Sequence, residues 1–208
     1  MTNDEVIFFK IDELLYTKFK GNRLGLDKPK IQHFYDTVNH LYLDELNDDE
    51  LYEIQLDVIC NWKETIDPTT FRNSLKKVAL LHDILEDTDT TIEELKEMGI
   101  TDTEIALISI LTRNPDKPTD IYWKEIFRSP EALTIKLADR ISNMKDILSW
   151  IKIDKNNKII KKILDKYYTE NISILSVVEI SNENRYNIRK QVSTITSLSK
   201  LINEYIKE

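Results

Sequence analysis

The chain contains three histidines, and one of them, His82, is followed directly by Asp83 at the end of a strongly apolar run. Glu86 and Asp87 follow, and each lies four residues after one member of the His-Asp pair. Adjacent side chains on a helix point about 100° apart, so both could reach one ion beside the helix. Imidazole and carboxylate ligands without thiolates suit Mn²⁺, Fe²⁺ or Zn²⁺. The cluster indicates either a divalent metal site or an acidic helix end exposed to solvent.

A second group that could take part in chemistry lies in the largely apolar segment 132–144. Asp139 and Asn143 are four residues apart there, on one face of an expected helix. A carboxylate in such a segment needs a partner, which is either a metal ion or a basic side chain such as Arg140. If Arg140 is the partner, the two form an ordinary surface ion pair that contributes little. The local pattern leaves both interpretations open.

Helices are expected to position these residues, because the spacing of apolar residues is helical through most of the chain. Three glycines and five prolines among 208 residues are few for a fold rich in β-turns. The expected helices span residues 6–16, 30–46, 47–64, 71–85, 92–98, 101–113, 119–128, 130–148, 155–180 and 183–206. We predict an all-α protein whose length allows one domain, or at most two small ones.

The composition narrows the classes of partner. Lys and Arg number 29 against 37 Asp and Glu, which gives a formal net charge of −8. This disfavours binding to nucleic-acid polymers, but a bound cation could still hold a small phosphorylated molecule. The single cysteine, Cys60, gives no internal disulfide and no cysteine metal cluster. Since neither a signal-peptide pattern nor an apolar run of about 20 residues is visible, we expect a cytoplasmic protein without a membrane partner.

Two segments taken together resemble the HD hydrolase domain of RelA/SpoT homologues. One is the run 78–88 with its His-Asp and Glu-Asp pairs, and the other is the run 135–144 with its Leu-Ala-Asp-Arg sequence. The resemblance covers about residues 5–150 and implies an HD-domain helical bundle. No synthetase module is expected.

The domain organisation follows from the same resemblance. We expect a single HD-type hydrolase domain over residues 1–208, with an inserted helix at about 46–68 and a C-terminal helical extension at about 151–208. The insertion is indicated by the distance between His33 and His82, which is roughly twice that usual in the family.

The resemblance also implies a set of metal ligands. One divalent ion, expected to be Mn²⁺, is held by His33, His82, Asp83 and Asp139. The segment 28–38 is similar to the one that carries the family's first histidine, although Phe34 stands where the family has proline and Lys30 where it has tyrosine. His40 is the less favoured ligand.

The resemblance also implies roles for residues that do not bind the metal. Glu86 and Asp87 are expected to be the catalytic carboxylates, and Asn143 is expected to contact the substrate or support the metal. Arg23, in the glycine-containing loop 20–29, is expected to bind the guanine base, and an ordinary solvated arginine is the alternative.

The activity implied is removal of the 3′-pyrophosphate from the nucleotides ppGpp and pppGpp. Two other functions remain open at the sequence level. One is an HD phosphohydrolase that acts on another nucleotide, such as a nucleoside monophosphate, a dNTP or NADPH. The other is a helical binding module without catalytic activity. The sequence gives no oligomeric state.

Overall fold

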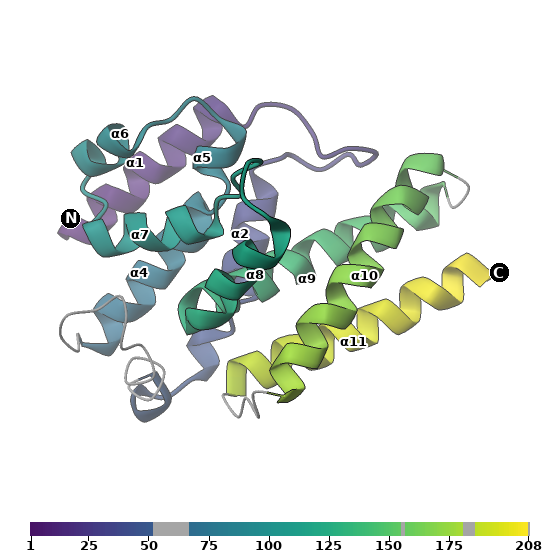
Figure 1. Cartoon of the computed structure of the whole chain (residues 1–208). Helices are drawn as coiled ribbons and strands as arrows, with labels where there is room; N and C mark the ends of the chain where they lie inside the picture. The colour runs from purple at the N-terminus through teal and green to yellow at the C-terminus, as the bar shows by residue number, and fades with distance from the viewer. Residues whose placement is uncertain (52–66, 155–156, 181–185, 208) are drawn as a thin grey trace.

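The structure is a computed structural model that describes residues 1–51, 67–154, 157–180 and 186–207 (Figure 1). Its helices are α1 (Asn3–Lys18), α2 (Gln32–Asn39), the short 3₁₀ helix η1 (Leu43–Glu45), α4 (Pro68–Leu81), α5 (Ile84–Asp87), α6 (Ile92–Met98), α7 (Asp102–Leu111), α8 (Thr119–Arg128), α9 (Pro130–Ile153), α10 (Lys158–Ile180) and α11 (Tyr186–Lys207). The described residues contain no β-structure except one isolated bridge between Asn22 and Pro29. The predicted all-α fold is confirmed.

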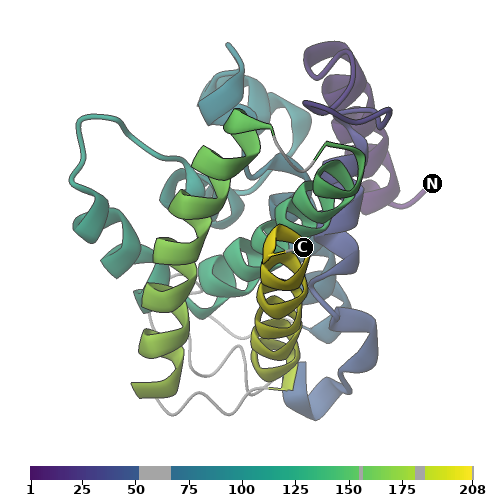
Figure 2. The same ribbon diagram turned by 90° about the vertical axis from the view of Figure 1, so that its right-hand side faces the viewer.

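Helix α9 is central to the molecule. It contacts α2, α4, α7, α8, α10 and α11, and it is buried on nearly every face, as expected of a helix that is surrounded by others. Figures 1 and 2 show the N-terminal helices on one side of α9 and helices α10 and α11 on the other. Asp139 lies within this central helix, so its position is fixed by packing from several directions.

Several helices begin where the sequence predicts, because their capping residues are local. Thr91 and Thr101 each accept a bond from the backbone three residues later, and Glu94 and Glu104 bond back to complete the capping boxes. Ser129 caps α9, and a proline follows it at the first helical position.

The predicted continuous helix over residues 71–85 is wrong in one respect, because the chain breaks at His82 and Asp83. Helix α4 ends at Leu81, and the short α5 begins at Ile84. The His82 ring nitrogen Nδ1 lies 2.8 Å from the Ala79 carbonyl oxygen, the acceptor that a continuing helix would offer to the backbone amide of Asp83. The His-Asp pair therefore lies in a turn between two helices.

The predicted helix over residues 30–46 is shorter than expected. It ends at Asn39, and Tyr42 then adopts a left-handed backbone conformation with φ of 55° before η1 begins. The next expected helix, at 47–64, is described only as far as Leu51. The rest of it, and with it most of the predicted insertion at 46–68, lies outside the described residues.

Candidate metal centre

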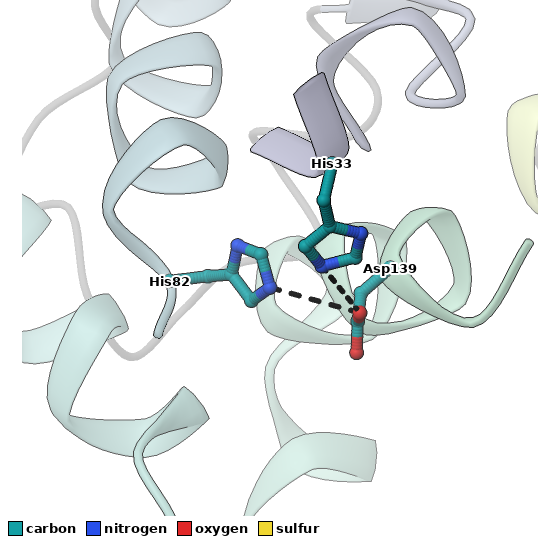
Figure 3. A group of neighbouring side chains, drawn as sticks. All are labelled: His33, His82 and Asp139. Carbon is teal, nitrogen blue, oxygen red and sulfur yellow. Dashed lines mark ion pairs between the residues drawn. The ribbon is translucent and has the colours of Figure 1, made fainter. Parts of the chain in front are cut away.

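Three side chains from separate parts of the chain converge beside α9 (Figure 3). His33 comes from α2, His82 from the turn after α4 and Asp139 from α9, and one ligand atom of each lies within 4.8 Å of the others. The distance from Asp139 Oδ1 is 3.2 Å to His33 Nε2 and 3.7 Å to His82 Nε2. All three residues are buried.

Asp83 completes the predicted set of four. One of its carboxylate oxygens lies 3.1 Å from His82 Nε2 and 3.9 Å from His33 Nε2. The turn between α4 and α5 brings Asp83 to the same point as its neighbour His82, which a straight helix would direct about 100° away. The structure thus brings His33, His82, Asp83 and Asp139 together, although they are far apart in the sequence.

Each imidazole is oriented by its other ring nitrogen. His82 Nδ1 donates to the Ala79 carbonyl, so Nε2 is the nitrogen that faces the carboxylates. His33 Nδ1 lies 2.9 Å from the hydroxyl of Ser142 on α9. Fixing one ring nitrogen in this way presents the other to a metal ion, an arrangement that is common in metalloproteins.

The electrostatics of the cluster favour positive charge at this point. Burial alone would lower the pKa of His82, but the carboxylates of Asp83 and Asp139 outweigh burial and raise this pKa to about 10. Burial keeps the pKa of His33 below its ordinary value. The carboxylates thus attract one cation, and a divalent ion can take that position with both imidazoles neutral.

The residues present fit a divalent ion in two further respects. His82 Nε2 is buried and has no hydrogen-bond partner, an arrangement that a metal–nitrogen bond would satisfy. Two imidazoles with carboxylates and no thiolate are a donor set for Mn²⁺, Fe²⁺ or Zn²⁺. The geometry is consistent with a divalent metal and does not select among these ions.

A lysine that the sequence interpretation missed lies at the same centre. Lys136, one turn before Asp139 on α9, forms an ion pair of 2.9 Å with Asp139 Oδ2. Burial would raise the pKa of Asp139, but Lys136 and the two histidines hold it well below its ordinary value. The three-residue spacing on an expected helix was a signal that could have identified this pair.

A cavity of about 460 Å³ opens on one side of the cluster. Its lining includes His33, Asp83, Asp87, Arg23 and Asn143, which are five of the residues selected from the sequence. Lys30, Trp150 and Tyr167 also line it, and the sequence interpretation did not assign them to the site. A cavity of this volume is in the range that holds small-molecule ligands.

Arg23 and Asn143 lie in this cavity and are held by neighbouring side chains. Arg23 donates to Asp146 at 2.9 Å and to the side-chain oxygen of Asn143 at 2.5 Å. Asn143 also donates to Asp139 Oδ1. The arginine in the loop is therefore linked through one amide to the metal cluster. Asp146, which also pairs with Lys28, is a further residue that the sequence interpretation missed.

Glu86 and Asp87 face different spaces. Asp87 lines the 460 Å³ cavity, and its pKa is raised by burial and by the negative charges of Asp83 and Glu86. Glu86 accepts a hydrogen bond of 2.9 Å from the backbone amide of Arg113 and lines a smaller cavity that Asp139 also lines. The two predicted catalytic carboxylates thus lie in different cavities.

His40 lies apart from the cluster of ligand atoms. It follows the last residue of α2, and its ring lies 6.1 Å from that of Tyr42. Burial, together with the charge of Lys145, lowers its pKa to about 4.

The paired motifs and the helical fold resemble those of the HD hydrolases of the RelA/SpoT type, and the comparisons with known proteins agree with this resemblance. In sequence, the chain is similar to the guanosine-3′,5′-bis(diphosphate) 3′-pyrophosphohydrolase of Aquifex aeolicus (strain VF5), with 34% identity over 118 residues. This match covers 50% of the chain and 16% of the relative, so the chain corresponds to a small part of that protein. No family model matches the chain.

The fold is similar to that of a solved structure described as a metazoan ortholog of SpoT that hydrolyses ppGpp and plays a role in starvation responses. The TM-score is 0.58 with 14% sequence identity, and the match covers 94% of each chain. At this identity the likeness shows the fold. The resemblance to RelA/SpoT hydrolases that the two motifs predict is confirmed. Among the described residues no helix is both long and apolar enough to span a membrane.

Proposed function

We propose that this protein is a metal-dependent phosphohydrolase that removes pyrophosphate from the 3′ position of ppGpp and pppGpp. The observation that carries the proposal is the convergence of His33, His82 and Asp139 to within 4.8 Å beside a cavity of about 460 Å³. The likeness to a ppGpp pyrophosphohydrolase in sequence supports the substrate.

The reaction is a hydrolysis. The oxygen of one water molecule forms a bond to the phosphorus next to the ribose, and the bond from that phosphorus to the ribose 3′-oxygen breaks. The 3′-oxygen takes a proton, so the products are GDP or GTP and pyrophosphate. His33, His82, Asp83 and Asp139 would hold the ion, which when bound polarises the phosphoryl group and makes the attacking water more acidic.

The other site residues would bind substrate and move protons. Asp87 has a raised pKa and lines the larger cavity, so it is the carboxyl group best suited to take a proton from water or give one to the 3′-oxygen. Glu86 would take part in proton transfer from the smaller cavity, which Asp139 also lines. Arg23 would contact the guanine base, and Asn143, which bonds both Arg23 and Asp139, would position the nucleoside relative to the ion.

Mn²⁺ is the ion we propose, on the basis of the resemblance and of the nitrogen and oxygen ligands. We also propose a single domain over residues 1–208 that works in the cytoplasm on a small nucleotide, without nucleic-acid polymers or a membrane as partners. The net charge of −8 supports the exclusion of nucleic-acid polymers.

The decisive experiment is a product assay with purified protein, Mn²⁺ and ppGpp. We expect GDP and pyrophosphate in equal amounts. Asp83→Asn should reduce kcat/KM by more than the roughly 10–100-fold that loss of a residue merely supporting a ligand costs. Asp89→Asn is the matched control, because Asp89 is an exposed aspartate shortly after α5 that pairs with Lys18, and it should keep full activity.

Other products would identify the alternatives. Release of phosphate from NADPH, a dNTP or a nucleoside monophosphate, with ppGpp left intact, would replace the proposed substrate. Tight nucleotide binding without turnover of any of them would indicate a binding module. An Asp83→Asn protein with undiminished activity would contradict the proposed mechanism.

A further inference from the structure

A second, smaller cavity of about 100 Å³ opens beside the centre and is lined mainly by residues of α8, α9 and α10, together with Glu86 of α5 and Arg113. Asp139 lines it, whereas His33 and Asp83 line the larger cavity. Tyr167 of α10 borders both. The candidate metal centre therefore lies between two cavities.

The small cavity is rich in basic side chains. Arg113, Lys136, Arg140 and Lys166 line it, together with three carboxylates, of which Asp139 pairs with Lys136 and Glu170 pairs with Arg140. The third carboxylate, Glu86, accepts a hydrogen bond from the backbone amide of Arg113 and not from its side chain. The Arg113 guanidinium instead donates to the hydroxyl of Thr119 at 3.0 Å. Arg113 and Lys166 form no ion pair among the described residues. The cavity thus has two cations that no carboxylate neutralises.

Arg140 provides a second, independent indication of a ligand. It is 4% exposed, and its guanidinium carbon lies 4.0 Å from the centre of the Tyr167 ring. One of its terminal nitrogens, Nη2, bonds Glu170, but the other, Nη1, is buried without a hydrogen-bond partner. Buried guanidinium nitrogens are usually paired, and a planar guanidinium with free donors matches the oxygens of a phosphate group.

We propose that this basic cavity binds the pyrophosphate half of the substrate and holds it after cleavage. The nucleoside would occupy the larger cavity on the opposite side of Asp139. The volume of about 100 Å³ equals that of about three water molecules, which suits one phosphoryl group. The terminal phosphoryl group would enter the cavity while the phosphoryl group next to the ribose stays at the metal centre. This inference rests on the proposed function for the identity of its ligand.

The cleavage step keeps the bond between the two phosphorus atoms intact. Water supplies one oxygen to the phosphorus next to the ribose, the ribose 3′-oxygen leaves with a proton, and the pyrophosphate anion remains beside Arg113, Arg140 and Lys166. Three basic side chains favour the most highly charged product, so we expect pyrophosphate to bind more tightly than inorganic phosphate.

The test is direct binding of inorganic pyrophosphate to the full chain, measured by isothermal titration calorimetry in metal-free buffer. We expect Arg113→Gln and Lys166→Gln to weaken the affinity about threefold each, and the double variant to weaken it about tenfold. Lys161→Gln is the matched control, because Lys161 is an exposed lysine on α10 that lines neither cavity, and its affinity should equal that of the parent. Mn²⁺ binding should be the same in the parent and in all four variants.

The outcomes separate this inference from the proposed function. Unchanged pyrophosphate affinity in the double variant, or an equal loss in Lys161→Gln, would overturn the inference even if ppGpp is hydrolysed. If ppGpp is not hydrolysed but pyrophosphate affinity depends on Arg113 and Lys166, the cavity remains a pyrophosphate site and the proposed function fails.

Discussion

Gly25 permits the loop that carries Arg23 to lie directly against helix α9. Its backbone φ is +74°, in the left-handed region, and a Cβ atom added there would lie 2.2 Å from the indole ring of Trp150. Trp150 is 8% exposed and lines the larger cavity with Arg23. The absence of a Cβ atom at Gly25 therefore allows the loop to pack against Trp150 in the cavity wall.

We predict that Gly25→Ala both destabilises the protein and weakens nucleotide binding. The methyl group would displace Trp150, at an overpacking cost of about 1–3 kcal/mol, in addition to about 1–2 kcal/mol for a left-handed residue. Gly21→Ala is the control, since Gly21 has a similar φ of +83° but no atom within 4 Å of the added Cβ. Urea unfolding and nucleotide titration of both variants measure the difference. Equal behaviour of the two variants would show that contact with Trp150 is unimportant.

Three of the four metal-ligand candidates could be selected from the sequence because their types are chemically rare in apolar segments, whereas His33 was assigned from the resemblance of segment 28–38 to RelA/SpoT hydrolases. His82 and Asp83 end an apolar run, and Asp139 interrupts another. The contacts that orient them could not be selected in the same way. Ser142 bonds His33 Nδ1. In the sequence it is one polar helix residue among many, and only the packing of α2 against α9 gives it this role.

At the scale of elements, α4 is joined to α7 by a buried ion pair. Lys77 on α4 pairs with Glu104 on α7 at 2.8 Å and with Asp4 on α1 at 3.2 Å. The Lys77 side chain is 6% exposed and that of Glu104 is completely buried. Lys76, the residue before Lys77 in the chain, instead forms an ion pair with the exposed Asp44.

This pair of adjacent lysines gives a prediction for the stability of the helix packing. Lys77→Met should lower the free energy of unfolding by about 3–5 kcal/mol, because it leaves the buried Glu104 carboxylate without its cation. Lys76→Met should change it by at most about 1 kcal/mol, since its partner is solvent-exposed. Chemical denaturation monitored by circular dichroism measures both values. Similar losses in the two variants would contradict a special role for the buried pair.

Element boundaries could be predicted where they depend on local chemistry. The starts at Thr101 and Ser129 follow from capping side chains and, at the second, from a proline, all visible in the sequence. The break at His82 could not be predicted, because the apolar periodicity continues through it. At the break, His82 Nδ1 donates a hydrogen bond to the carbonyl oxygen of Ala79. This bond forms only in the folded site, so the sequence does not indicate it.

At the scale of the whole molecule, the candidate metal centre joins three distant parts of the chain. His33 lies on α2, His82 follows α4 and Asp139 lies on α9. An ion bound only by the folded arrangement stabilises that arrangement by mass action. Stability should therefore depend on the concentration of metal.

We predict that Mn²⁺ raises the melting temperature. At a concentration 100 times its Kd, the ion should add about 2.7 kcal/mol, which corresponds to roughly 5–10 °C for a protein of this size. Asp139→Asn should abolish the shift, whereas His40→Gln should retain it because His40 lies outside the cluster. Thermal melts with and without EDTA test this, and a shift that persists in Asp139→Asn would mean that the stabilising ion binds elsewhere.

The all-α fold class could be predicted from helical periodicity and the HD-type bundle from the resemblance of the two motifs, but the second cavity could not be predicted. Arg113 precedes α8, Arg140 lies on α9 and Lys166 lies on α10. Nothing in their spacing indicates a common site, because their proximity depends on how three helices pack. The chain has 29 Lys and Arg residues, so the residue types of these three alone do not indicate a binding site.

Tyr167 borders both cavities, and this position has a thermodynamic consequence. A ligand that displaces the tyrosine ring from one side changes the space available to a ligand on the other side. Such an effect must be reciprocal: whatever factor one occupant imposes on the affinity of the second, the second imposes on the first. The release of one reaction product would then depend on whether the other has already left.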